Sequence, residues 1–184
     1  MNSKKLTIVL PGIGYHKDKP LLYYASKLAL SKSYDIFYIE CKDLPAKIVG
    51  DPEMMQMAVQ MAYAQAVEQL DRIDLSEYSD IVFIGKSIGT IVAAKYVKEY
   101  GIKARQIWYT PLEATFMFST KHAIAFIGDA DPWSDVERVK EISKSMHIKM
   151  YSYPECNHSL ECKSVDRNIS IIREVMQITE KYLG

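Results

Sequence analysis

Cysteine is scarce in this sequence, and its arrangement excludes two kinds of stabilising site. The 184 residues include three cysteines, Cys41, Cys156 and Cys162, and no CxxC pair. An odd number argues against a disulfide framework, and the lack of closely spaced ligand pairs argues against a zinc site. We therefore expect three reduced thiols and no metal.

The sequence also lacks an excess of either charge and any long apolar run. Lys plus Arg and Asp plus Glu both total 23, so no global field would gather nucleic acid or an anionic membrane. No stretch approaches the roughly 18 apolar residues of a membrane span, and the run Leu6–Leu10 is too short for a signal peptide. These absences predict a cytoplasmic protein that acts on a compact, roughly neutral small molecule, without nucleic acid or membrane partners.

Short apolar runs alternate with longer stretches of helical period, a pattern typical of a parallel sheet with helices on both faces. Each run is nearly continuous in apolar or aromatic residues, as strands buried on two sides should be. The predicted strands are Leu6–Leu10, Asp35–Ile39, Ile81–Ile84, Gln106–Tyr109, Ala123–Ile127 and Ile148–Tyr153. Without repeats or linkers, residues 1–184 are predicted to form one doubly wound α/β domain with a mostly parallel, six-stranded sheet.

Helical periodicity predicts five helices between and after these strands. Pro20 suits the first turn of one helix, and a second helix lies near residues 51–70. A third follows Ser87 and ends at Gly101. The methionine-rich stripe of the second helix is expected in the core and comprises Met54, Met57, Ala58 and Met61.

The last two helices are predicted from capping and spacing. Ser134 and Glu137 form a plausible capping box for the fourth helix. Its sheet-facing residues are expected to be Val139, Ile142 and Met146. The fifth helix is expected to pack across the sheet through Val165, Ile169, Ile172 and Met176.

The sequence Gly-Lys-Ser-Ile-Gly at residues 85–89 matches the G-x-S-x-G pattern of a nucleophile turn. It directly follows a predicted strand and directly precedes a helix, which is where such a turn exposes a serine hydroxyl. The two glycines are needed because side chains there would collide with neighbouring backbone. Ser87 is therefore the candidate nucleophile, and the Lys86 side chain is expected to point to solvent.

The chain offers four histidines as a general base for Ser87. His158 follows the last predicted strand and so lies at the same edge of the sheet as the serine. His122 and His147 precede their strands and fall at the opposite edge. His16 lies on the correct edge, but its loop suggests a substrate-wall or surface role, so we assign the base to His158.

Three aspartates follow the fifth predicted strand and compete to orient the histidine. Asp131 is favoured because Pro132 holds it out of the helical region, and because the order serine, aspartate, histidine suits a doubly wound sheet. Asp129 could instead be a turn residue after Gly128, and Asp135 an exposed charge in a first helical turn. Asp129 stays the main alternative for the acid.

An oxyanion needs two backbone N–H donors, one from the residue after the nucleophile and one from the loop after the first strand. Ile88 would supply the first donor. The second would come from Ile13, Gly14 or Tyr15, in a loop whose glycines let backbone approach a substrate. A tight strand-to-helix turn would explain the same glycines.

The connection between the fourth and fifth strands, residues 110–122, offers loose apolar surface near the site. Phe116 and Met117 are the candidate substrate-binding residues, because they could form a small acyl wall. About ten residues cannot fold as a lid with its own core, so short acyl chains should be preferred. Alternatively, these side chains pack the connection onto the sheet.

These motifs together resemble the α/β-hydrolase superfamily over nearly the whole chain. They are the Pro-Gly-x-Gly first loop, the serine turn, the acid loop at 128–133 and the histidine loop at 157–161. The resemblance implies the strand order 2-1-3-4-5-6 and a minimal member without the two usual leading strands or a cap domain. It also implies a serine hydrolase that cleaves a small carboxylic ester or thioester through an acyl-enzyme.

Other readings of these motifs fail or stay open. Asp80 stands where a phosphate-binding loop would need glycine, and Lys17 stands where a dinucleotide fingerprint would need glycine or alanine, so no cofactor is expected. A non-catalytic binding protein with the same fold remains an alternative. So does a peptidase, amidase or acyltransferase that uses the same three residues.

Overall fold

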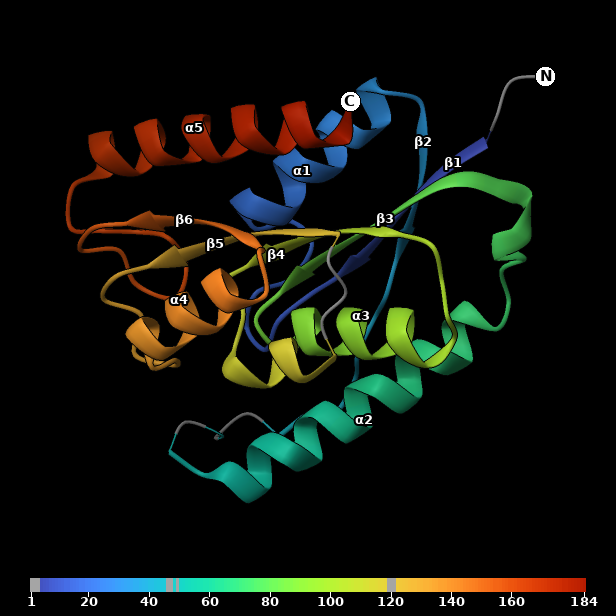
Figure 1. The fold of residues 1–184 in the computed structure, drawn as a ribbon, viewed down its shortest axis with the longest axis horizontal. Helices are drawn as coiled ribbons and strands as arrows, with labels where there is room; N and C mark the ends of the chain where they lie inside the picture. The colour runs from blue at the N-terminus through green and yellow to red at the C-terminus, as the bar shows by residue number, and fades with distance from the viewer. Residues whose placement is uncertain (1–3, 46–47, 49, 119–121) are drawn as a thin grey trace.

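A parallel sheet forms the centre of the structure, a computed structural model that describes residues 4–45, 48, 50–118 and 122–184. The strands in these residues are β1 (Lys4–Leu10), β2 (Tyr34–Tyr38), β3 (Tyr78–Lys86), β4 (Arg105–Tyr109), β5 (Ala123–Gly128) and β6 (Lys149–Tyr153). Every neighbouring pair is parallel, in the order β2-β1-β3-β4-β5-β6 (Figure 1). This confirms the predicted order and brings the loops after β1, β3, β5 and β6 to one edge.

Helices cover both faces of the sheet (Figure 1). One face carries α1 (Pro20–Ser31) and α5 (Val165–Leu183), and the other carries α2 (Pro52–Leu70), α3 (Ile88–Glu99) and α4 (Val136–Ser145). The short 3₁₀ helices η1 (Leu75–Glu77) and η2 (Glu113–Phe118) lie in connections. The α/β class is therefore as predicted. No helix within the described ranges combines the length and apolarity that crossing a membrane requires.

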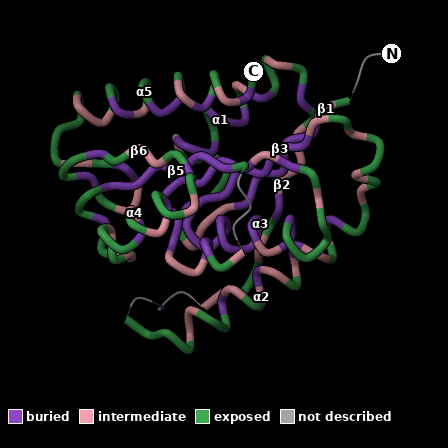
Figure 2. The backbone as a smooth tube through the Cα atoms, in the orientation of Figure 1, coloured by how far each residue is buried: buried purple, intermediate pink, exposed green. Residues whose placement is uncertain are grey.

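The four central strands, β1, β3, β4 and β5, are mostly buried on both sides, which explains their nearly continuous apolar sequences. On β3, Val82 and Ile84 pack in the same cluster as α1 and α5, whereas Phe83 packs with α2 and α3. Figure 2 shows the buried positions concentrated along the strands and the exposed ones on the outer sides of the helices. Successive residues of a strand point to opposite faces, so both faces need apolar side chains.

The predicted methionine stripe of α2 is wrong for most of its members. Met57 is 49% exposed, and of the four predicted residues only Ala58 is buried. The buried stripe is Ala58, Ala62, Ala66 and Leu70. The stripe that packs against the rest of the fold is made mostly of alanines, and the three methionines are only partly buried or exposed. Helical spacing alone does not reveal which of the two stripes is buried.

The predicted inward face of α5 is also partly wrong. Val165 and Ile169 are 72% and 65% exposed, whereas Met176 is buried and Ile172 is partly buried against the core. The buried residues of α5 are Ile171, Val175, Met176, Thr179 and Leu183. Two apolar stripes share this helix, and the sequence alone did not distinguish the one that faces the sheet.

The cap of α4 lies one residue beyond the predicted position. The helix begins at Val136, and the Asp135 carboxylate accepts the N–H of Arg138 at 3.1 Å. The Ser134 hydroxyl instead donates to the Pro111 carbonyl. The inward face is as predicted, because Val139 is buried and Ile142 and Met146 pack around it.

Candidate active site

Ser87 occupies a strained turn between β3 and α3. Its φ and ψ angles are 54° and −124°, and its N–H donates to the Tyr109 carbonyl at 3.0 Å. A Cβ at Gly85 would meet Gly89 backbone at 2.8 Å, and a Cβ at Gly89 would meet the Leu10 carbonyl at 2.4 Å. Only glycine fits both positions, so these residues allow the backbone turn that presents the serine.

Hydrogen bonds join Ser87, His158 and Asp131 into one chain. The distance from Ser87 Oγ to His158 Nε2 is 2.8 Å, and the distance from His158 Nδ1 to Asp131 Oδ2 is 2.7 Å. The Asp131 side chain is fully buried and that of His158 is 14% exposed. The structure thus brings together the three residues that the sequence nominated, over separations of 71 and 27 positions.

The loops that carry Asp131 and His158 are held against each other by backbone contacts. The Ala130 N–H donates to the Cys156 carbonyl at 2.9 Å. A Cβ at Gly128 would lie 2.2 Å from that same carbonyl, so glycine is required for the close approach. The Asn157 side chain accepts the N–H of Ser159 and fixes the histidine loop from within. Both side chains of the site therefore extend from ordered turns.

The competing aspartates have other partners. The Asp129 carboxylate forms an ion pair with Lys140 at 2.9 Å, and Asp135 caps α4. The Asp131 carboxylate faces the histidine and also accepts the Trp133 N–H at 2.9 Å. Asp131 is therefore the member of the trio whose carboxylate reaches His158.

The remaining histidines lie away from Ser87. His16 is exposed, and its Nδ1 accepts the N–H of Asp18. The backbone of His122 pairs with Gln106 at the start of β4, and His147 precedes β6. Both of these last residues sit at the sheet edge opposite the serine, as the strand directions required.

Burial has the largest effect on the pKa of His158. Desolvation lowers the pKa of its imidazole below the ordinary 6.5, the hydrogen bond that it donates to Asp131 raises this pKa, and the Lys86 ammonium lowers it. The balance favours the neutral ring. A neutral imidazole with Nδ1–H directed at a carboxylate leaves Nε2 free to accept a proton from Ser87.

The prediction that the Lys86 side chain points to solvent is wrong. Its side chain is 1% exposed instead of pointing to solvent, and its Nζ lies 4.9 Å from the centre of the Tyr15 ring. Burial lowers the pKa of Lys86 to about 7, and the Asp131 carboxylate opposes that shift. The signal available in the sequence was its place at the end of a strand whose preceding residues, from Ile81 onward, are apolar or glycine and are buried in the structure.

Trp133 is a site residue that sequence reasoning missed. Its indole stacks on the His158 imidazole, with ring centroids 5.0 Å apart and planes at 15°. The residue is partly buried and packs against the cluster beneath α2 and α3. Its position two residues after the candidate acid was visible, but loop sequences do not reveal which ring a side chain will cover.

The loop after β1 narrows the choice of oxyanion donors. The Tyr15 N–H already donates to the Gly12 carbonyl at 3.2 Å, so Tyr15 is removed as a candidate donor. Ile13 and Gly14 remain for this loop, beside Ile88 at the start of α3. A Cβ on Gly12 would lie 3.0 Å from the Ser87 Cβ, which places the loop directly against the serine.

A cavity of about 290 Å³ lies beside the same loop. It is lined by Pro11, Gly12, Ile13, Gly14, His16, Cys41 and Leu44. Phe116 is not among these residues, because it packs edge to face on Trp108 in a core cluster, and Met117 is 71% exposed on η2. The packing of Phe116 and Met117 therefore does not support their prediction as a substrate wall.

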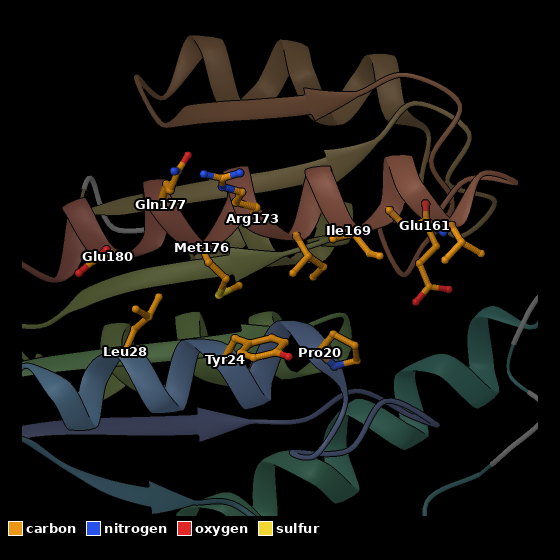
Figure 3. Close-up of a pocket in the computed structure, with 12 residues that line it drawn as sticks. Pro20, Tyr24, Leu28, Glu161, Ile169, Arg173, Met176, Gln177 and Glu180 are labelled. Atoms are coloured by element: carbon orange, nitrogen blue, oxygen red, sulfur yellow. The ribbon is translucent and has the colours of Figure 1, made fainter.

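A larger hollow of about 750 Å³ lies between α1 and α5 (Figure 3). Tyr24 and Leu28 on α1 face Ile169 and Met176 on α5, and Arg173 also belongs to its lining. None of the three hydrogen-bonded residues lines this hollow. It is separate from the candidate active site.

Comparison of the sequence with protein-family models finds no match, and comparison with curated proteins finds no significant relative. Solved structures are nevertheless similar over nearly the whole chain. The esterase Est1E from Butyrivibrio proteoclasticus is 13% identical, with a TM-score of 0.66 over 99% of this chain and 89% of that chain.

Two further solved structures give the same picture. An esterase from Pyrococcus furiosus is 15% identical, with a TM-score of 0.64 over 98% of this chain and 83% of its own. An alpha-beta serine hydrolase homologue from Coxiella burnetii is 14% identical, with a TM-score of 0.65 over 100% of this chain and 86% of its own. At these identities the likeness shows a shared architecture, and the predicted α/β-hydrolase fold is confirmed.

Proposed function

We propose that this chain is a serine hydrolase that cleaves a small carboxylic ester or thioester through an acyl-enzyme. The observation that carries the proposal is the unbroken series of hydrogen bonds from Ser87 through His158 to Asp131. A serine becomes nucleophilic when a base lies within hydrogen-bond reach and a third group orients that base. The similar folds of two esterases and a serine hydrolase homologue support hydrolase chemistry.

In the proposed reaction, His158 Nε2 takes the hydroxyl proton while Ser87 Oγ attacks the carbonyl carbon. The resulting imidazolium keeps its Nδ1–H on Asp131 and gives its Nε2 proton to the departing alkoxide or thiolate. Water then attacks the acyl-enzyme and loses a proton to His158. The acid is released and the serine hydroxyl is restored.

Backbone N–H groups would stabilise the negative oxygen of each tetrahedral intermediate. The Ile88 N–H starts α3, where the helix dipole also favours negative charge. Ile13 or Gly14 would give the second hydrogen bond from the loop after β1. This arrangement requires no cofactor in the proposed mechanism.

The cavity beside the β1 loop supports a small acyl group as the substrate portion nearest the serine. Its volume of about 290 Å³ lies at the lower end of the roughly 300–1,000 Å³ typical of small-molecule sites. Ile13 and Leu44 supply apolar surface there. A short acyl chain would fill this space without a lid.

Labelling with a fluorophosphonate probe tests the proposal before any substrate is known. We expect stable modification of the native protein, located at Ser87 by mass spectrometry of peptides. The Ser87→Ala variant, checked for folding by circular dichroism, should not react. A folded native protein that stays unlabelled at neutral pH would contradict serine catalysis and favour a binding protein of the same fold.

A further inference from the structure

Lys86 is a buried cation next to the candidate nucleophile, and the proposed reaction steps give it no part. Among the described residues, Lys86 and Asp131 are the two side chains of the Asp, Glu, Lys and Arg types that are buried. Burying a lone ammonium is costly, because water no longer solvates it. Its retention at this position therefore needs a compensating interaction.

The Asp131 carboxylate supplies part of that compensation. Its negative charge raises the pKa of Lys86 against a larger desolvation that lowers it to about 7. The lysine is thus still an ammonium in the acidic range where a histidine titrates. The two buried charges have opposite sign, and the negative one, the Asp131 carboxylate, orients His158.

Tyr15 also contacts the lysine. The Nζ of Lys86 lies 4.9 Å from the centre of its ring, a favourable geometry for a cation over an aromatic face. The Tyr15 hydroxyl accepts the buried Leu21 N–H at 3.1 Å, and its backbone pairs with Gly12. The ring is therefore fixed, and the lysine packs against the β1 loop, where a Cβ at Gly12 would lie 3.5 Å from its Cγ.

The ammonium also acts on the histidine. It lowers the pKa of His158, because adding a second positive charge nearby is unfavourable, whereas Asp131 raises it. The imidazole also contacts the Ser87 hydroxyl and the Trp133 ring, neither of which carries a charge. The Lys86 ammonium is thus the positive charge that opposes the Asp131 carboxylate at His158.

We propose that Lys86 is a positioning residue whose buried ammonium offsets the Asp131 carboxylate and keeps His158 unprotonated in mildly acidic solution. It acts through the field at the histidine and makes no contact with the reacting atoms. This inference rests on the proposed function, because it concerns His158 as the base. It extends that function by naming the group that sets the lower pH limit of activity.

Titration of His158 by NMR tests the inference without any turnover. The histidine signal is assigned by its loss in His158→Gln and followed in the native protein and in Lys86→Met, which keeps length and removes charge. We expect the His158 midpoint to rise by about one pH unit in Lys86→Met. An unchanged or lower midpoint would overturn the inference.

Lys95→Met is the matched control. Lys95 also places its Nζ over a tyrosine ring, 4.0 Å from the centre of Tyr63, but on α3 away from the histidine. This variant should leave the His158 midpoint within about 0.2 pH units of the native value. An equal rise in both variants would also overturn a specific role for Lys86.

The kinetic profile separates a field effect from a packing effect. In Lys86→Met the ratio of kcat/KM at pH 5.5 to that at pH 8 should fall by a factor of about three to ten, because a rise of about one unit in the base pKa lowers the fraction of neutral base at pH 5.5. A purely structural role would lower kcat/KM equally at both pH values and would contradict the inference. If the native protein hydrolyses no ester, the proposed function fails, and the NMR titration still decides the role of Lys86.

A measurement on the unaltered protein covers the case in which Lys86→Met does not fold. With ¹³C-labelled lysine, one ammonium should titrate near the Lys86 pKa of about 7. The His158 signal should show a second inflection at the same pH. A His158 signal that shows no second inflection when the buried ammonium loses its proton would overturn the inference.

Discussion

The indole of Trp133 covers one face of the His158 imidazole, with the two ring planes 15° apart. The backbone N–H of Trp133 also donates to the Asp131 carboxylate, so one residue contacts both partners of the nucleophile. A stacked ring excludes water from that face and favours the transient imidazolium through its π electrons. It also holds the imidazole plane in the orientation that points Nε2 at Ser87.

Replacing this indole should slow the reaction without abolishing it. We expect Trp133→Leu to lower kcat/KM about tenfold, because a misplaced imidazole loses transition-state stabilisation. Trp133→Phe should retain most activity, since a ring still covers the histidine. Steady-state assays with a p-nitrophenyl ester would measure both. Equal losses in the two variants would show that stacking is not what matters.

The candidate nucleophile and base should behave as one unit. Ser87→Ala and His158→Ala are each expected to lower ester turnover by at least ~10³-fold, and the double variant should be little worse. The reason is that either change already removes the activated serine. A double-mutant cycle on kcat measures this directly, and additive losses would contradict the assignment.

The acid can be identified by a comparison of two asparagine variants. Asp131→Asn should cut kcat by about 10³ to 10⁴-fold, because an amide favours the wrong histidine tautomer. Asp129→Asn should cost less than about tenfold in kcat, since its carboxylate pairs with Lys140. Its effect should appear as a small decrease in Tm. An inactive Asp129→Asn beside an active Asp131→Asn would reassign the acid.

Activity should rise with pH through a midpoint below 6.5, the ordinary histidine value. Only neutral His158 can accept the serine proton, and burial lowers its pKa, so the base form persists into more acidic solution. Profiles of kcat/KM between about pH 4.5 and 8 would locate the midpoint. A flat profile with rate-limiting chemistry, or a midpoint above 6.5, would contradict this role or this environment for His158.

The sequence was sufficient for those parts of the site that depend on strand direction. Ser87, Asp131 and His158 each follow a parallel strand, so their meeting at one edge follows from chain order. The alternation of strand and helix patterns also predicted helices on both faces of the sheet, because local periodicity and turn chemistry determine the elements. The strand order, in contrast, was implied by the resemblance to the α/β-hydrolase superfamily.

Features that depend on side-chain packing were not predictable in the same way. Val165 and Ile169 fit a helical stripe yet are exposed, because a second stripe of α5 faces the sheet. Lys86 looked like a solvent-exposed lysine because intrinsic preference favours the surface, but its position ends a doubly buried strand. The orientation of Trp133 likewise depends on contacts between loops distant in sequence.

The cavity beside the β1 loop predicts a preference for short acyl chains. With p-nitrophenyl esters from acetate to palmitate, kcat/KM should peak at a short chain, because about 290 Å³ accommodates only a small group. Leu44 lines this cavity, so Leu44→Ala should enlarge it and move the optimum to longer chains. Leu30→Ala, at a residue 49% exposed on α1, should leave the optimum unchanged and serves as the control. A native optimum at palmitate would show that the acyl group binds elsewhere, and an optimum unmoved by Leu44→Ala would exclude this wall as its limit.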